Sequence, residues 1–345
     1  MEKHVLTTIY RPDGKLSVLA GPHFNPTLVM EGRPSVHLPR QVMTLDRLHA
    51  LIAAGYGQGH GETYLAWMRV RRRLTSRVSN LVVLANPLYA TRPFHLLSRL
   101  EAKGAIVALW LGARELREQF PLWPDDHPHP DWGGPGQTAA TLQYVPGLIS
   151  IAKEAGIKHG NFPGTTIPYV ASADLLIRPP QDRVAPLTLV PVKPNSEIEK
   201  PGRKGMRVLE RLELQRRYAN VVGARYVEFT DATCSALMAS QLDWFMPLHS
   251  ELKARLSSDE LYMFAEKFNV LCSELPISSC IRSVQQAMGI GSADIVFLLF
   301  RIAAWSGLIN IDFRKPILMR SLIRLDADGY KASLADQLFG PRAPQ

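Results

Sequence analysis

The sequence predicts a mixed α/β domain followed by a helical C-terminal domain. Two segments rich in β-forming residues, 174–177 and 187–192, flank a Pro-Pro turn and predict a hairpin. The amphipathic segment 206–222 and the strand-like segment 225–230 follow the hairpin and complete a small α/β sheet. From about residue 245 the composition changes to helical segments that are separated by stop signals.

Composition and charge limit the class of protein and of partner. The chain has 345 residues, enough for two or three domains, and its 46% hydrophobic and 21% charged residues are typical of a globular protein. The net charge of +9 suits a polyanionic partner such as nucleic acid, although mildly basic proteins without such a partner are common. Three cysteines without metal-ligand spacing, no signal peptide and no apolar run of spanning length predict a reduced, cytoplasmic compartment and no membrane partner.

The segments before the first predicted sheet strand are interpreted as an N-terminal extension, residues 1–54. Its first forty or so residues are rich in Pro and Gly and are typical of an extended arm, and Met43–Ala54 predicts a helix capped by Thr44. The glycines of Gly55–Gly61 suggest a phosphate-binding loop. Because no Lys-Ser/Thr follows and no strand–helix context is present, a flexible turn is favoured.

A basic segment follows this turn. Its arginines are Arg69, Arg71, Arg72, Arg73 and Arg77. Such a density in a chain with excess positive charge predicts contacts with a DNA backbone, with a solvated strand as the alternative.

The next segments predict a strand at Asn80–Leu84, a mostly buried helix within residues 93–111 and a strand at Leu116–Leu122. Glu101 lies in the middle of that helix. A carboxylate on a helix that lies against a sheet can reach the edge of the sheet, so Glu101 is a candidate site residue. The alternative is an ordinary helix Glu that is exposed or has its hydrogen bonds satisfied. A further short helix is predicted at Leu148–Ala155.

The loop Asp125–Gln137 invites a zinc interpretation, because Asp125, His127, His129 and Asp131 alternate along it. Interleaved prolines and glycines do not provide the fixed second shell that a zinc site needs. A mobile insertion is therefore favoured.

The predicted hairpin carries the residues that chemistry needs for cutting a phosphodiester. Asp174 begins its first strand, and Lys193 follows its second. A carboxylate can hold Mg²⁺, the backbone carbonyl of Val192 can supply a second oxygen, and a lysine can orient water and offset developing negative charge. A solvated surface hairpin is the alternative for this pair alone.

A polar linker is predicted at residues 195–205, before the last helix and strand of the α/β sheet. The C-terminal region that follows, residues 245–330, predicts a winged-helix domain. Its helices are predicted at Asp259–Leu275, Ser278–Met288 and Ser292–Gly307, and its β segments at Leu308–Phe313 and Pro316–Leu325. Winged-helix domains bind DNA or protein, so the fold alone does not decide the role. Residues 331–345 are interpreted as a tail.

Several stretches, in order along the chain, resemble TnsA, the endonuclease subunit of heteromeric bacterial cut-and-paste transposases. They are GQGHG at Gly57–Gly61, HLLSRLE at His95–Glu101, LREQFPL at Leu116–Leu122, GIKH at Gly156–His159, SADLL at Ser172–Leu176, VKP at Val192–Pro194, LERLELQRRY at Leu209–Tyr218 and FTD at Phe229–Asp231. Their occurrence in the order that the family has argues against chance similarity.

The resemblance implies an α/β restriction-endonuclease-like (PD-(D/E)xK) nuclease core at residues 55–240, with catalytic positions at Glu101, Asp174 and Lys193. The metal ligands would be Glu101, Asp174 and the Val192 carbonyl, and the cofactor Mg²⁺, with Mn²⁺ as the alternative. The implied activity is a nick at the 5′ strands of double-stranded transposon ends. A TnsB-like transposase would cut the 3′ strands, and a TnsC-like AAA+ ATPase would contact the C-terminal region.

One position departs from the pattern of such enzymes. Two residues before Lys193, where Glu or Gln is usual, stands Pro191, which offers no side-chain oxygen. A single metal ion could be held without it, Glu118 or Gln119 could help, or the site could be weak without partners. A non-catalytic DNA- or ATPase-binding adaptor with a degraded nuclease fold, and a stand-alone repair or restriction nuclease, are therefore kept as alternatives.

Overall fold

A four-stranded mixed sheet lies at the centre of the α/β part of the computed structural model, which describes residues 6–10, 16–20, 42–70, 81–134, 144–255 and 258–344. Its strands, in spatial order, are β10 (Arg225–Tyr226), β9 (Thr188–Val190), β8 (Ala171–Arg178) and β5 (Glu115–Leu122). The pairs β5–β8 and β8–β9 are antiparallel, and β9–β10 is parallel. The predicted hairpin and the strand at 116–122 are thereby confirmed.

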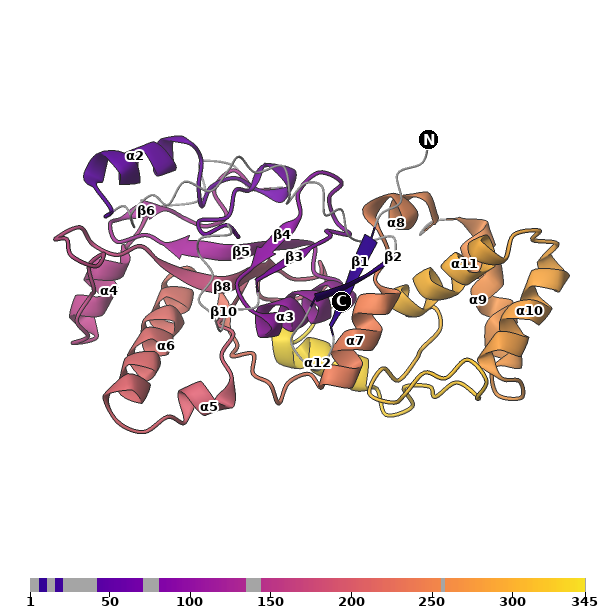
Figure 1. The fold of residues 1–345 in the computed structure, drawn as a ribbon. Coiled ribbons are helices and arrows are strands. Elements are labelled where there is room, and N and C mark those ends of the chain that lie inside the picture. Colours follow the sequence, from indigo (N-terminus) through magenta and orange to yellow (C-terminus); the bar gives the residue numbers. More distant parts are fainter. Residues whose placement is uncertain are drawn as a thin grey trace.

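Helices cover both faces of this sheet (Figure 1). On one face, α3 (Arg99–Trp110) packs with Leu116 and Leu175 in a cluster that we call the α3 cluster. On the other face, α4 (Leu148–Glu154) and α6 (Arg203–Val221) pack with Phe120 and Leu176 in what we call the α6 cluster. Burying apolar side chains on both faces stabilises the sheet and fixes which polar side chains remain between α3 and the strands.

The segment before α3 differs from its prediction. Residues 94–96 form strand β4, which pairs with β3 (Val82–Leu84), and the helix begins only after Ser98. The Ser98 hydroxyl accepts a hydrogen bond from the Glu101 amide and so caps the helix. The prediction of helix at Leu96 and Leu97 was wrong because leucine periodicity does not reveal such a cap.

The remaining elements are short. They are β1 (Leu6–Tyr10) and β2 (Leu16–Ala20), α2 (Leu45–Ala53), the 3₁₀ helix η1 (Gly61–Thr63), β6 (His127–Pro128), β7 (Tyr144–Val145), α5 (Asn195–Ile198), α7 (Ala236–Phe245) and α8 (His249–Arg255). Thr44 caps α2 as predicted. The predicted polar linker at 195–205 instead contains α5 and the start of α6.

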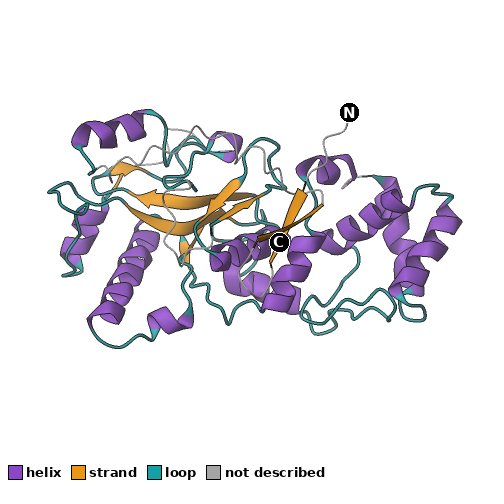
Figure 2. Ribbon diagram, viewed as in Figure 1, coloured by secondary structure: helices purple, strands orange, loops and turns teal. Residues whose placement is uncertain are grey.

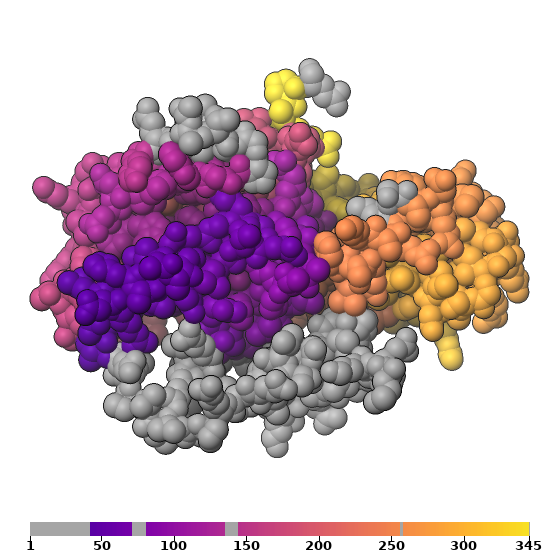
Figure 3. Space-filling view, turned by 90° about the horizontal axis from the view of Figure 1, so that it is seen from above, coloured from indigo at the N-terminus to yellow at the C-terminus, as the bar shows by residue number. Residues whose placement is uncertain are grey.

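The C-terminal helices α9 (Asp259–Leu271), α10 (Ile277–Met288) and α11 (Ala293–Ser306) confirm the three predicted helices. They gather at one end of the molecule, away from α4 and α6, in a part made of helices and loops (Figures 1 and 2). The same end projects from the α/β body in the space-filling view (Figure 3). The α3 cluster nevertheless continues through α7 into these helices, so one apolar core joins the two parts.

The two β segments predicted at Leu308–Phe313 and Pro316–Leu325, which would form the wing of a winged-helix domain, are not strands. Residues 308–325 are irregular and form one isolated bridge, Ile311 with Leu325. Asp312 turns back on its own segment, because its carboxylate accepts hydrogen bonds from the backbone and guanidinium of Arg314. Such local hydrogen bonds compete with a β ladder, and Pro316 has no amide to donate to one.

The predicted tail is also wrong, because residues 330–339 form a helix, α12 (Tyr330–Phe339). Its buried residues include Leu334, Leu338 and Phe339 of the α3 cluster. Within the described ranges, no single helix is long and apolar enough to cross a membrane; α10 and α11 together have the length and composition, but they meet at a bend of 115°.

Candidate active site

Strand β5 is unusual because all eight of its residues are buried although four are polar or charged. These four are Glu115, Arg117, Glu118 and Gln119. A buried charge is tolerated only where it is paired and hydrogen-bonded. Each of these side chains has such partners, and they come from segments far away in the sequence. The strand therefore contributes to two polar clusters. One contains Gln119 and lies beside α3, and the other contains Glu115, the first residue of β5.

Asp174 and Lys193 meet across the predicted hairpin. The Asp174 Oδ2 atom accepts hydrogen bonds from the Val192 amide at 2.7 Å and from Lys193 Nζ at 2.9 Å. Lys193 Nζ also donates to the Val192 carbonyl at 2.9 Å. Burial by itself would lower the pKa of Lys193, but the charge of Asp174 and the hydrogen bond to it raise the pKa above its usual value. The lysine is therefore a firmly held cation.

Glu101 faces the same site from the first turn of α3. Its Oε2 accepts from the Leu97 amide at 2.8 Å and from Gln119 Nε2 at 2.9 Å, and its Oε1 accepts from the Ser98 hydroxyl at 3.2 Å. Burial, and next the negative charge of Asp174, raise the pKa of Glu101 to about 7. The fold thus brings two carboxylates close enough to repel each other.

Of the two residues suggested as helpers, the structure brings only Gln119 into contact with a carboxylate of the candidate site, that of Glu101. Its Nε2 contacts Glu101, and its Oε1 accepts from the Ser172 hydroxyl at 3.1 Å. Glu118 is used elsewhere: its carboxylate accepts from Arg92 at 2.8 Å and from the His95 amide at 3.1 Å.

The donor set suits a hard cation bound by oxygen. Across the described ranges, no group of three or more His, Cys, Asp or Glu side chains is placed to hold a metal ion, so Glu101 and Asp174 need carbonyl, amide or water oxygens beside them. The Lys193 ammonium already lies against Asp174 Oδ2 and the Val192 carbonyl, which shows that these two oxygens attract a cation. A divalent ion would also relieve the repulsion between the two carboxylates.

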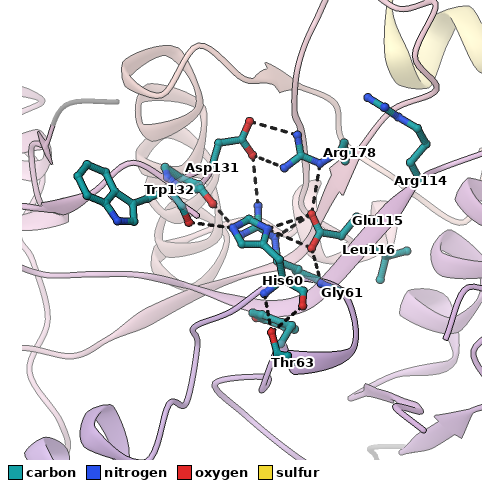
Figure 4. Close-up of polar contacts among 12 residues, drawn as sticks. His60, Gly61, Thr63, Arg114, Glu115, Leu116, Asp131, Trp132 and Arg178 are labelled. Atoms are coloured by element: carbon teal, nitrogen blue, oxygen red, sulfur yellow. Dashed lines mark hydrogen bonds and ion pairs between the residues drawn. The ribbon is translucent and has the colours of Figure 1, made fainter. Parts of the chain in front are cut away.

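The opposite end of β5 carries a second polar cluster (Figure 4). Glu115 accepts from the Gly61 amide at 2.8 Å and lies 3.2 Å from His60 Nδ1, while Arg178 donates to Glu115 and, at 2.7 Å, to Asp131. Burial would raise the pKa of Glu115, but the hydrogen bond from His60, the charge of Arg117 and the other partners lower it to about 2. This cluster fastens two loops to the sheet.

The cluster corrects two predictions about those loops. Gly55–Gly61 is not a flexible turn: a Cβ on Gly57, which has a φ of 76°, would lie 2.4 Å from Pro121, so the loop is tightly packed. The Gly61 amide is bound to a carboxylate and does not face an open phosphate cradle.

The described part of the loop at 125–137, residues 125–134, is not a mobile insertion. Asp131 is buried against Arg178, His127 contacts the Tyr218 hydroxyl at 2.9 Å and His129 contacts the Val222 carbonyl at 3.0 Å. The two histidines and Asp131 have separate partners, so they do not form the zinc site that their spacing suggested.

The basic segment can be placed only at its first residue. Arg69 is partly buried and donates to His95 Nε2 at 3.4 Å through Nε. Burial, and next the charges of Arg69 and Arg92, lower the pKa of His95 to about 4, which keeps this ring neutral. Arg71, Arg72, Arg73 and Arg77 lie outside the described residues.

Sequence reasoning missed the buried pair of Arg92 and Glu118 and the cluster around Glu115. The signal for both was present in β5, where charged residues interrupt an otherwise apolar strand pattern. A strand of that kind indicates either an exposed edge or buried pairing, and sequence separations of 26 residues for Arg92–Glu118 and 47 for Asp131–Arg178 hide the partners.

Comparison with known proteins supplies an independent observation. No family model matches the chain. The transposition protein TnsA of transposon Tn7 from Escherichia coli is 29% identical over 201 residues, which cover 58% of this chain and 62% of that relative. The chain thus spans about three fifths of the length of the relative. Together with the ordered motifs that contain Glu101, Asp174 and Lys193, this similarity supports a TnsA-like protein.

Proposed function

We propose that this chain is a Mg²⁺-dependent endonuclease that nicks the 5′ strands at transposon ends during cut-and-paste transposition. The observation that carries the proposal is the convergence of Glu101, Asp174 and Lys193 beside one end of α3. Two carboxylates and a lysine are the groups that metal-assisted phosphodiester hydrolysis requires. The similarity to TnsA supports DNA ends as the substrate.

Each residue has a distinct role in the proposed site. Glu101, Asp174 and the Val192 carbonyl would hold the metal ion, with Mn²⁺ as an alternative to Mg²⁺. The ion, when bound, polarises the phosphoryl group and acidifies a water molecule. Lys193, which remains protonated because Asp174 raises its pKa, stabilises the negative charge that develops on the phosphoryl oxygens and orients water.

The proposed partners follow from the similarity and from charge. Double-stranded transposon ends would bind to a chain whose net charge is +9, with Arg69 and the arginines that follow it as backbone contacts. A TnsB-like transposase would cut the other strands, and a TnsC-like ATPase would contact the C-terminal helices. We place the restriction-endonuclease-like core in the α/β part around β5, β8 and α3.

The test compares Asp174→Ala with Asp46→Ala, an exposed aspartate in the first turn of α2 that has no part in the site. Purified variants are incubated with end-labelled transposon-end DNA, Mg²⁺ and the cognate transposase. We expect Asp174→Ala to lose 5′ nicking while its circular dichroism and transposase binding stay normal, and Asp46→Ala to nick as the wild type does. Nicking by Asp174→Ala would refute the assignment.

A second candidate function rests on one observation. Pro191 replaces the usual Glu or Gln beside the site, which favours a non-catalytic adaptor that binds DNA or the ATPase. If the wild-type chain binds these partners but nicks no DNA in any mixture of proteins, the adaptor replaces the enzyme. A chain that cuts DNA unaided, without a transposase, would instead be a stand-alone nuclease.

A further inference from the structure

Asp174 has two neighbours across the sheet, one on each flanking strand. In the pair β8–β9, Leu175 lies opposite Val190, and continuing this register places Pro191 opposite Asp174. In the pair β5–β8, Glu118 lies opposite Leu175 and Phe120 opposite Ala173, which places Gln119 opposite Asp174. The carboxylate is therefore flanked by a proline without a side-chain oxygen and by an amide that has one.

The backbone is distorted at the level of Gln119 and Asp174, so that both side chains turn toward α3. Residues an even number of positions apart in a regular strand face the same side. Yet Leu116 belongs to the α3 cluster and Phe120 to the α6 cluster, and Leu175 and Ala173 are divided in the same way. The two strands therefore both change face between these residues, where Gln119 and Asp174 lie opposite each other.

The change of face in β5 coincides with an unfavourable backbone conformation at Gln119. Its φ of 49° lies in the left-handed region, where no other non-glycine residue of the described chain is found. A residue of this type is held there at a cost, and such strain collects at functional sites. The distortion places the amide of Gln119 against Glu101, whereas an undistorted strand would direct it toward α6.

The surroundings of the amide accept either of its two orientations. In the structure, Nε2 donates to Glu101 Oε2 and Oε1 accepts from the Ser172 hydroxyl. If the amide is rotated by half a turn, Nε2 can donate to the same hydroxyl, because a hydroxyl both donates and accepts. Oε1 then points toward Glu101. Ser172 thus keeps a hydrogen bond to the amide in both orientations, while the bond from Nε2 to Glu101 is given up and the amide oxygen becomes available to a cation.

We propose that Gln119 supplies the side-chain oxygen that Pro191 cannot, and that it acts as a ligand of the divalent cation beside Glu101 and Asp174. This inference rests on the proposed function, because it requires a metal ion in that site. Glu118 does not compete for the role, since Arg92 and the His95 amide engage its carboxylate. The missing ligand on one neighbouring strand is thereby replaced from the other.

The test measures cation binding by the full chain without DNA. Isothermal titration calorimetry with Mg²⁺ is run on the wild type, Gln119→Gly, Gln119→Glu and a control, Gln215→Ala, which changes a buried glutamine of α6 on the opposite face of the sheet. Glycine removes the amide and adopts a φ of 49° without strain, so this variant should fold. We expect Gln119→Gly to bind Mg²⁺ about tenfold more weakly, and Gln119→Glu at least as tightly as the wild type.

The outcomes separate this inference from the function on which it rests. If the wild type and Gln215→Ala bind Mg²⁺ and Gln119→Gly binds it equally well, Gln119 is no ligand, while the nuclease proposal stands. If the wild type binds no Mg²⁺ without DNA, the inference about Gln119 fails, and the nicking test with the transposase decides the nuclease proposal separately. Should Gln119→Gly not fold, Gln119→Glu decides: a Kd that is clearly weaker than that of the wild type overturns the inference, because a carboxylate keeps the oxygen and adds charge.

Discussion

Replacing Glu101 by Gln should stabilise the metal-free protein at alkaline pH. The carboxyl group has a pKa of about 7 in the folded protein and 4.5 as its usual value, because burial and Asp174 disfavour its charged form. This difference corresponds to a cost of up to about 3 kcal/mol once the group is ionised in both states. A glutamine at this position keeps the shape and can still accept from Leu97 and Gln119, but it carries no charge.

The sign of the effect with pH follows from the direction of the shift. Between pH 4.5 and 7 the unfolded chain releases this proton and the folded chain keeps it, so the contribution of Glu101 to stability falls as pH rises. The two proteins should therefore have similar free energies of unfolding at pH 4.5 and differ by up to about 3 kcal/mol at pH 8. Asp174 and Lys193, the nearest charges, are the same in both proteins.

The assay is urea unfolding followed by circular dichroism, at pH 4.5 and pH 8, in the presence of a chelator. Addition of Mg²⁺ at pH 8 should then narrow the gap, because an ion bound only by the folded wild type stabilises it by mass action. Equal stabilities at pH 8, or a gap that is the same at both pH values, would refute the claim that Glu101 is a strained, ionisable site residue.

Three further substitutions test the surroundings of the site by their effect on urea unfolding. Arg92→Met removes the partner of the buried Glu118 and should lower the free energy of unfolding by about 3 kcal/mol at pH 8. The loss should be smaller at pH 5, because burial raises the pKa of Glu118 to about 7 and the carboxyl group is then protonated; an equal loss at both pH values would contradict this assignment. Gly147→Ala places a Cβ 2.2 Å from the Pro124 carbonyl oxygen and should lower the free energy of unfolding by about 1–3 kcal/mol. An unchanged urea midpoint would show that the backbone around Pro124 moves aside at no cost. Asp326→Ala removes the carboxylate that accepts two amides at the start of α12, both at 2.9 Å, and should cost about 1 kcal/mol; full stability would mean that this cap is dispensable.

The parts of the fold that could be predicted are those whose signals are local. The hairpin that joins Asp174 to Lys193 is encoded by β-forming residues on each side of a Pro-Pro turn, and α9 and α11 are bounded by the caps Ser258 and Ser292. Local signals also misled. Apolar residues at 308–325 suggested strands, whereas Asp312 binds its own segment and the chain there stays irregular.

The parts that could not be predicted depend on contacts between distant residues. Nothing near Gln119 in the sequence shows that its side chain turns toward α3, because that requires the distortion opposite Asp174. Glu101 was a weak candidate until the resemblance to TnsA singled it out. Its sequence neighbours do not reveal that its carboxyl group lies buried near Asp174, which together with burial raises its pKa to about 7.

The most direct measurement of the central claim maps the nick on labelled transposon-end DNA at single-nucleotide resolution. The wild type and Lys193→Ala are compared with Mg²⁺, with and without the cognate transposase. We expect a nick at the 5′ strand that requires the transposase and that Lys193→Ala loses, because the ammonium beside Asp174 is the only charge of its kind that contacts the hairpin carboxylate in the described structure. A nick that persists in Lys193→Ala, or none in the wild type although DNA and partners bind, would contradict the assignment of this site as a nuclease centre.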